Sequence, residues 1–539
     1  MIWNQTQQQT TFLHRVNPLL DDEHRRLLDT ALRLLVEKYS EAERTLKNVL
    51  SDDQGKRTGF HGFGRRVRRG KYAFLKDTLD GIIKDLENSH KRFDPTWFLI
   101  MVMANPTIDQ QLKELNTKPK AVTTSGPLSS TEPQSSTGTV QTAPFSTVPI
   151  SRESPLTLAQ GVRSAIHSNV PPKKIMFEYQ DMRTVALPYC TAVMAMRPSS
   201  TRGADQPLII DTLRRFPGSN MTDLESDVRS LAKRLANSDP YTFGLLRCKG
   251  AMPIPRRVSP AQGYDLVLRV PDGMSRPTSL RQMLLNPEAQ ALPSLTRRLR
   301  IAQQLTSSVS YVHNFSFVHK GICPESILIL SADAQNSVGQ QPPCFTFLVG
   351  FGNFRAADGS TALIGDTAWE KNIYRHPERQ GEYLQDAYRM QHDVYSLGVC
   401  LLEIGLWESF VEYISENELQ KPKDSKSYQE FRAWVDSQME IEKNETDPES
   451  ERMTSQVAHS QRMSFRLREY LLHLAETRLP HTMGEMYKDV VVSCLSPGGD
   501  DWSDQEDDLQ RDAVEDEGGI AVGVHFNEEI LGKLAEITL

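Results

Sequence analysis

The feature that most constrains the fold of this chain is a series of four short segments in its C-terminal half. Three of them combine apolar residues with a few polar ones, and one is mostly polar. In chain order, the segments are Val318–Leu328, Cys344–Gly352, Tyr374–Glu378 and His392–Gly405. The second starts with an apolar run of strand length, and the fourth is apolar over the length of a buried helix.

The series resembles the motifs of protein kinases in order and spacing. Val318–Leu328 is similar to the catalytic loop H-R-D-x-x-x-x-N, and Gly350-Phe351-Gly352 stands where kinases have D-F-G. Tyr374–Glu378 resembles the A-P-E segment, and His392–Gly405 resembles the central helix of the C-lobe. The resemblance covers roughly residues 170–539. It implies an α+β, bilobal fold with a small β-rich N-lobe and a mainly helical C-lobe, preceded by an N-terminal α-helical bundle.

The same resemblance implies that the reactive positions of a kinase have changed. Gly321 replaces the catalytic Asp, Ser326 the metal-binding Asn, and Gly350 the metal-binding Asp of D-F-G. Cys323 stands where Ser/Thr kinases usually have a Lys that neutralises phosphate charge. Positioning and electrostatic stabilisation supply nearly all kinase catalysis. We therefore predict a pseudokinase, without enzymatic activity and without a metal site.

The structural residues of the kinase motifs are retained. They are His319, Phe351, Gly352, Pro377, Glu378 and Asp393. By itself, His319 would be an ordinary core histidine and Asp393 an ordinary helix N-cap. The resemblance implies that Asp393 braces the catalytic loop through backbone N–H groups, and that Glu378 forms a buried ion pair. The candidate partners of Glu378 are Arg466, Arg468 and Arg478.

The N-lobe departs most from the kinase pattern. Lys173–Met182 contains a possible strand, in which Gln180 is the best match to the ATP-binding lysine, and a loop follows to about residue 220. Leu224–Ala236 has apolar residues at helical spacing, with Asp227 at the position of the glutamate that pairs with that lysine. No Gly-rich loop precedes Lys173–Met182. We predict no cofactor, with ATP as the alternative.

Further elements are predicted from the residue pattern alone. Phe243–Cys248 and Tyr264–Val270 are expected to be strands, and Leu295–Asn314 an amphipathic helix. Phe526–Ile537 is expected to be a terminal helix that packs back on the C-lobe.

The length of 539 residues indicates two or three domains. We expect a disordered N-terminus at 1–19, a helical bundle at 20–115, a Ser/Thr/Pro-rich linker at 116–160 and the kinase-like domain at 161–539. Within this last domain we expect an N-lobe at about 170–270, a C-lobe at about 271–539, a polar insertion at 415–460 and an acidic loop at 500–519.

Charge is distributed unevenly, although the net charge is only −7. Residues 56–76 contain eight basic residues and no acid, which favours contact with an anionic membrane surface. The candidate lipid-binding residues are Arg65, Arg66, Arg68, Arg69 and Lys71. A solvated basic loop is the alternative. Protein partners are expected, whereas nucleic acid is not, because no aromatic residues or known motif accompany the cluster in a binding pattern.

The six cysteines are scattered, without metal-ligand spacing, which fits a reducing compartment. We expect a cytoplasmic protein, peripheral at membranes if the basic segment binds lipid.

A helical bundle before a degenerate kinase-like domain resembles a fungal group that carries a HeLo domain (HET-S/LopB-type, prion-inhibition and propagation). The resemblance is carried by Leu295–Leu305, Phe317–Lys320 and Leu401–Trp407, and by the helical pattern of residues 20–112. It implies a pseudokinase regulator in incompatibility or cell-death type signalling. Two alternatives stay open. One is a weakly active atypical kinase in which Glu325 or Asp366 substitutes for the lost acids, and the other is a nucleotide-independent scaffold without a membrane role.

Overall fold

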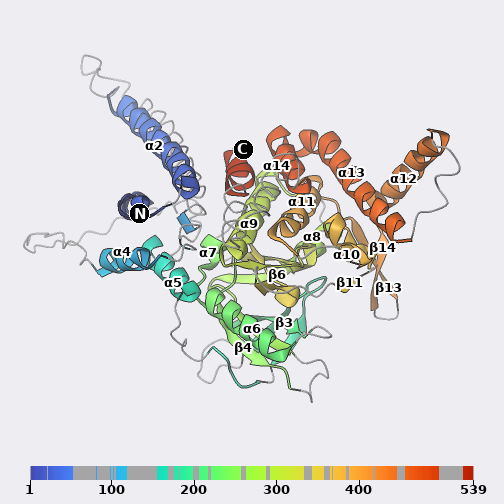
Figure 1. Ribbon diagram of the computed structural model, residues 1–539, viewed down its shortest axis with the longest axis horizontal. Helices are drawn as coiled ribbons and strands as arrows, with labels where there is room; N and C mark the ends of the chain where they lie inside the picture. Colours follow the sequence, from blue (N-terminus) through green and yellow to red (C-terminus); the bar gives the residue numbers. More distant parts are fainter. Residues whose placement is uncertain are drawn as a thin grey trace, which may run out of the picture.

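The computed structural model describes the chain in segments. They are residues 2–20, 22–51, 81, 97–98, 101, 105–117, 154–167, 175–180, 182–197, 206–215, 220–255, 263–286, 292–332, 343–356, 364–366, 368–383, 388–416, 419–445, 456–496 and 526–537. Figure 1 shows N-terminal helices, an antiparallel β-sheet with one long helix against it, and a mainly helical region. This mixed α+β arrangement is consistent with a kinase-like fold.

The N-terminal helices are α1 (Ile2–Val16), a short 3-10 turn (Asn17–Leu19), α2 (Asp22–Ser51), α4 (Pro106–Thr117) and α5 (Pro155–His167). Helices α1, α4 and α5 contact one another. Phe12, Leu13 and Val16 lie on one side of α1 and are almost fully buried, with the Phe12 ring edge-on to Trp97. The expectation of a disordered segment at 1–19 was therefore wrong. Three apolar side chains on one face give α1 a surface to bury.

Arg163 fixes α5 to α4. Its guanidinium group is 1% exposed and donates to both carboxylate oxygens of Asp109, at 2.8 and 2.9 Å. It also donates to the backbone carbonyls of Met101 (3.2 Å) and Asn105 (3.0 Å). Because α5 starts at Pro155, the expected linker at 116–160 was wrong at its C-terminal end, and most of it, residues 118–153, lies outside the described residues.

The N-terminal helices pack directly on the kinase-like region. Helix α5 contacts α6 (Met221–Ala236). The ring of Phe98 lies 4.9 Å from that of Phe243 and 5.6 Å from that of Tyr311, edge-on in both cases. These aromatic contacts join the two parts through one continuous apolar core.

The sheet of the N-lobe has five antiparallel strands in the order β1-β2-β3-β5-β4. The strands are β1 (Arg183–Ala186), β2 (Val193–Arg197), β3 (Gln206–Arg214), β4 (Cys248–Pro253) and β5 (Gly263–Arg269). The expected loop up to residue 220 was wrong, because it contains β1, β2 and β3. The expected strand at Phe243–Cys248 was also wrong: α7 (Pro240–Phe243) is helical, and β4 begins at Cys248.

Helix α6 follows β3 and packs beside β4. Its N-cap Asn220 accepts a hydrogen bond from the backbone N–H of Thr222, which satisfies one of the free donors of the first turn. The predicted apolar stripe is confirmed, since Val228, Leu231 and Leu235 are fully buried.

The C-lobe helices are α8 (Leu280–Leu285), α9 (Leu295–Asn314), α10 (Trp369–Asn372), α11 (Met390–Leu406), α13 (Gln456–Met483) and α14 (Glu485–Leu495). Helix α9 has the predicted bounds. Helix α11 is buried from His392 to Leu406 and contacts α9, α13 and α14. A Cβ atom on Gly398 would lie 2.7 Å from that of Cys494, and one on Gly405 would lie 2.5 Å from Leu479, so both glycines permit the close approach of helices.

Short strands and turns surround these helices. The strands are β6 (Met274–Ser279), β7 (Phe317–Val318), β8 (Ile327–Ala332), β9 (Cys344–Leu348), β10 (Arg355–Ala356), β11 (Ile364–Asp366) and β12 (Gly381–Tyr383). The 3-10 turns are η3 (Pro324–Ser326), η5 (Phe351–Asn353) and η6 (Pro377–Arg379). Strands β6, β8 and β9 form one sheet, β7 pairs with β10, and β11 pairs with β12.

The polar insertion predicted at 415–460 contains regular structure. A hairpin of β13 (Val411–Glu416) and β14 (Leu419–Asp424) precedes α12 (Lys426–Glu445). The chain ends in the π-helix η8 (Phe526–Gly532) and α17 (Lys533–Glu536), which pack on α9 and α14 as predicted. The acidic loop at 500–519 lies outside the described residues. Among the described residues, none of the helices has the length and apolar character needed to cross a bilayer.

We predict that Arg163→Met destabilises the packing of α5 on α4. The substitution keeps much of the side-chain volume but leaves two buried carbonyls without their donors. The expected loss is about 2–3 kcal/mol, less than for a fully buried ion pair because the Asp109 carboxylate is 39% exposed. Urea unfolding followed by tryptophan fluorescence measures it. The control Arg229→Met removes an exposed pair with Glu225 and is expected to change stability by less than about 0.5 kcal/mol. Equal effects of both substitutions would contradict this prediction.

Candidate functional site

The positions of the kinase-like motifs converge where the N-lobe sheet meets the C-lobe. Asp393, at the start of α11, accepts hydrogen bonds from the backbone N–H groups of His319 (2.7 Å) and Lys320 (2.9 Å). This is the brace that the sequence resemblance implied. The His319 ring is buried, packs on Phe351 at 4.9 Å, and has Nε2 3.0 Å from the carbonyl oxygen of Val349. Burial lowers the pKa of His319, so the ring is neutral.

Three of the four positions that depart from the kinase motifs differ in the space around them. The hydroxyl of Ser326 is buried and bonded within its own turn, to the N–H (3.1 Å) and carbonyl (2.9 Å) of Cys323. A Cβ atom on Gly321 would make only ordinary contacts, the nearest at 3.6 Å. Gly350 has φ +84°, and its Cβ would come within 2.6 Å of the Thr191 hydroxyl. An Asp therefore fits at 321 but not at 350.

Asp211 is a site residue that the sequence interpretation missed. It lies on β3, the strand that directly precedes α6, at the end of the run Leu208-Ile209-Ile210-Asp211. In kinases a V-A-I-K run on the third strand carries the ATP-binding Lys. Strand β3, and not the Gln180 segment, thus occupies the position of the lysine strand. The apolar run before the predicted helix Leu224–Ala236 was the signal that could have identified it.

The Asp211 carboxylate binds the loop that replaces D-F-G. One of its oxygens accepts hydrogen bonds from the backbone N–H groups of Gly350 (2.7 Å) and Phe351 (2.9 Å). The side chain is 1% exposed, and this burial, with the nearby Asp265, raises the pKa of Asp211 to about 6 although the two N–H groups oppose the shift. A phosphate group at this position would meet a carboxylate instead of an ammonium group.

The loop Leu187–Ala192, between β1 and β2, closes the space beside Asp211. The N–H of Thr191 donates to the carbonyl of Glu325 in η3 at 3.0 Å. The carbonyl of Pro188 accepts from the Ser279 hydroxyl at 2.9 Å, and the ring of Tyr189 lies 5.0 Å from that of Tyr413. This loop precedes β3, as the phosphate-covering Gly-rich loop of kinases precedes the lysine strand, but it contains no glycine.

The side chain of Cys190, in the same loop, is close to both lobes. Burial raises the pKa of its thiol to about 11, and the Asp211 and Glu325 carboxylates add to the shift. The loop therefore lies between the Asp211 strand and the η3 turn, where a kinase would hold nucleotide phosphates.

A buried network of charged side chains from α8 and α11 holds the η3 turn in place. Arg281 on α8 is fully buried and donates to Glu325 (2.8 Å), to Glu403 of α11 (3.0 Å) and to Tyr374. Glu325 also accepts from the hydroxyl of Tyr413 at 2.7 Å. These bonds fix Glu325 in a structural role. Of Asp366, the second acid proposed as a substitute base, the structure gives the backbone pairing with Gly381 in the β11–β12 hairpin.

The structure separates the remaining predicted N-lobe residues. Gln180 lies four residues after Met176, which forms a parallel bridge with Ala251 of β4, a strand at the edge of the sheet. Asp227 lies half-buried on α6. The lipid-binding candidates Arg65, Arg66, Arg68, Arg69 and Lys71 lie outside the described residues.

The predicted buried ion pair of Glu378 was wrong. Its side chain is 42% exposed, and its carboxylate lies 3.5 Å from His376 Nδ1 and 3.6 Å from His392 Nε2. Arg478, one predicted partner, binds Glu408 instead. Pro377 and Arg379 of η6 are buried, but the Glu378 side chain reaches water, so its carboxylate requires no buried partner.

His376, Glu378 and His392 bring three possible metal ligands within 4.8 Å of one another. However, Nδ1 of His392 accepts a hydrogen bond from the backbone N–H of Arg389 at 3.0 Å. This bond places the proton of the neutral ring on Nε2, the nitrogen that faces Glu378. A metal would have to displace that proton, so the arrangement does not favour a metal site.

We predict that Asp211→Asn removes a pH-dependent loss of stability. The pKa of Asp211 is about 6 in the folded protein and about 3.9 in an unfolded chain. The wild type therefore keeps the full contribution of the neutral carboxyl below pH 4 and loses it as the pH rises through 6. Asparagine accepts the same two hydrogen bonds without ionising. The variant should gain up to about 3 kcal/mol relative to wild type at pH 7.5, and less at pH 5.

Urea unfolding at both pH values measures this difference. Asp211→Leu is the contrasting variant, because it leaves the N–H groups of Gly350 and Phe351 without an acceptor and should destabilise at both pH values. A difference between wild type and Asp211→Asn that does not change with pH would contradict the prediction.

Comparison with known proteins gives a distant and partial similarity. No family model matches the chain. A serine/threonine-protein kinase-like protein of Arabidopsis thaliana is 29% identical over 134 residues, which are 24% of this chain and 33% of that protein. A probable serine/threonine-protein kinase of Saccharomyces cerevisiae is 30% identical over 108 residues, 19% of this chain and 27% of that protein. The chain is thus distantly similar to serine/threonine-protein kinase-like proteins, over a third or less of their length.

Proposed function

We propose that this chain is a pseudokinase: a kinase-like protein without phosphoryl-transfer activity that acts by binding protein partners. The observation that carries the proposal is the exchange of charge at the cleft. Asp211 stands at the lysine position, Gly350 stands at the position of a metal-binding Asp, and the two are hydrogen-bonded to each other. The cleft has thereby lost both the cation that holds nucleotide phosphates and an anion that holds their metal.

The position of the loop Leu187–Ala192 supports the same proposal. Thr191 donates its N–H to Glu325 from the place where nucleotide phosphates would lie. A nucleotide would have to break this bond, displace the loop and approach the Asp211 carboxylate. Each of these steps opposes binding, so the atypical kinase and the nucleotide sensor are weaker alternatives.

A finer proposal concerns the N-terminal helices. We propose that they form an effector unit that the pseudokinase holds in place, in signalling of the fungal incompatibility or cell-death type. The aromatic contacts of Phe98 with Phe243 and Tyr311 support such a latch. The HeLo assignment itself rests on sequence resemblance. Contact with an anionic membrane and a cytoplasmic location stay predictions. Residues 56–76, which contain the basic cluster, lie outside the described residues.

We predict that neither ATP nor ADP raises the melting temperature of the full chain, with or without magnesium. A ligand at 100 times its Kd would stabilise the folded state by about 2.7 kcal/mol, so binding would be visible in a thermal-shift measurement. A magnesium-independent rise would favour a nucleotide sensor. A magnesium-dependent rise accompanied by transfer of radiolabelled phosphate would favour the atypical kinase. Either result would contradict the proposal.

We also predict that the two lost acids differ in how easily they can be restored. Gly350→Asp should destabilise the protein by about 2–4 kcal/mol, because it combines a left-handed backbone with a clash against Thr191 and Ser326. Gly321→Asp should cost less than about 1 kcal/mol, because its surroundings leave space. Urea unfolding compares the two variants. Neither should transfer phosphate, and a Gly350→Asp variant as stable as Gly321→Asp would show that the loop closes the cleft less tightly than proposed.

A further inference from the structure

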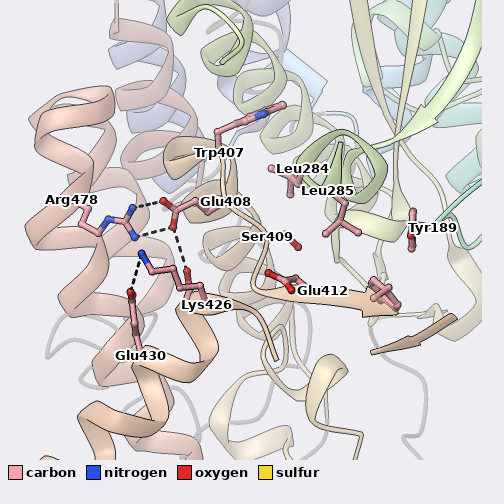
Figure 2. A pocket seen from close by; sticks show the side chains of 12 residues that line it. Tyr189, Leu284, Leu285, Trp407, Glu408, Ser409, Glu412, Lys426, Glu430 and Arg478 are labelled. Atoms are coloured by element: carbon pink, nitrogen blue, oxygen red, sulfur yellow. Dashed lines mark hydrogen bonds and ion pairs between the residues drawn. The ribbon is translucent and has the colours of Figure 1, made fainter. Parts of the chain in front are cut away.

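A cavity of about 770 Å³ lies outside the cleft, between α8, the β13–β14 hairpin, α12 and α13. Its volume is in the range of ligand-binding sites. Figure 2 shows leucine side chains of α8 on one side and charged side chains of α12 and α13 on the other. The apolar and aromatic lining residues are Tyr189, Leu284, Leu285, Trp407 and Tyr413.

The cations of the charged wall already have acidic partners within the wall. Arg478 donates two hydrogen bonds to Glu408, one of them at 2.9 Å. Lys426 lies 3.6 Å from Glu430, one helical turn away. These pairs are visible at the left of Figure 2. The cavity therefore offers no cation that lacks an anion, which makes an acidic ligand a poor match.

Glu412 differs from the other acids of the wall. In Figure 2 it lies between the leucines of α8 and the ion pairs of α12 and α13. Its carboxylate is 44% exposed and lies 3.7 Å from the ammonium group of Lys423, which is 52% exposed. An exposed pair at this distance contributes about 0–1 kcal/mol. A cation that enters the cavity can replace Lys423 at little cost.

The aromatic side of the cavity also suits a cation. Tyr189 and Tyr413 stand with their rings 5.0 Å apart, and the hydroxyl of Tyr413 is fixed by Glu325. Tyr189 (φ +50°) has a left-handed backbone conformation, which is unfavourable for a bulky residue, whereas that of Trp407 (φ +55°) forms the C-terminal cap of α11. Such strain is concentrated at functional sites in proteins. Guanidinium and ammonium groups are attracted to aromatic ring faces.

We propose that this cavity binds an arginine- or lysine-bearing peptide segment of a partner protein. The basic group would pair with Glu412, and the aliphatic part of the segment would pack on Leu284, Leu285 and the tyrosine rings. This inference rests on the proposed function as a partner-binding pseudokinase, and it adds the chemistry of the partner. Since Tyr189 belongs to the loop that closes the cleft, a bound segment contacts both lobes.

Fluorescence anisotropy with the full chain tests the proposal. The probes are fluorescein-labelled pentapeptides: Leu-Arg-Leu-Arg-Leu, and the same peptide with Gln or Glu in place of Arg. The Arg peptide is expected to bind, and the Gln and Glu peptides to bind at least about tenfold more weakly, as the loss of a charge-assisted hydrogen bond implies.

Two matched variants locate the binding site. Glu412→Gln should weaken binding of the Arg peptide about tenfold. Glu225→Gln, on α6 in the other lobe, changes a glutamate with the same 44% exposure and should leave binding unchanged. Thermal unfolding verifies that both variants fold. Leu285→Trp, which fills part of the cavity, should also weaken binding.

Three results would overturn the proposal: no binding of the Arg peptide at millimolar concentration, equal binding of the Gln peptide, or equal loss in both glutamate variants. These results are distinct from failure of the proposed function, which would appear as nucleotide binding or phosphate transfer. An Arg peptide that binds through Glu412 to a chain that also transfers phosphate from ATP would keep the cavity assignment and remove the pseudokinase assignment.

Discussion

The carboxylate of Asp393 is the interaction on which the arrangement of the C-lobe depends. It accepts hydrogen bonds from the N–H groups of His319 and Lys320 and from the hydroxyl of Tyr388, and it lies 3.2 Å from Nε2 of His313. Four chain segments meet at this one buried side chain. Burial by itself would raise the pKa of Asp393, but these donors hold the pKa below its usual value, so the group stays ionised and bonded.

The charged groups next to Asp393, between the two lobes, differ from those of a kinase. A kinase places a cation on the third strand and carboxylates opposite it to hold metal and phosphates. Here Asp211 supplies a carboxylate on the strand side, and the backbone N–H groups of Gly350 and Phe351 satisfy it. Interactions that would hold a ligand are replaced by interactions within the protein. The arrangement is consistent with a kinase-like fold in which contacts within the chain hold these segments together.

Long and strongly periodic elements were predictable from the sequence. Helix α9 was predicted from Leu295 to Asn314, and the buried stripe of α6 was predicted because its apolar residues repeat at helical spacing. Strands β1 and β2 have only four and five residues, too few to show an alternating pattern, so the sequence predicts a loop there. With β3 unrecognised, Asp211 could not be assigned, and the lysine position was given to Gln180 instead.

The sequence by itself determined that positions 321, 326 and 350 carry no carboxylate or amide side chain, because Gly321, Ser326 and Gly350 lack such groups whatever the fold. It also determined the buried helices, since their periodicity is a local property. Only the tertiary structure decided what fills the cleft. The contact of Thr191 with Glu325 joins residues 134 positions apart, and that of Asp211 with Gly350 joins residues 139 positions apart. No local pattern encodes such pairings, because they arise when the two lobes pack together.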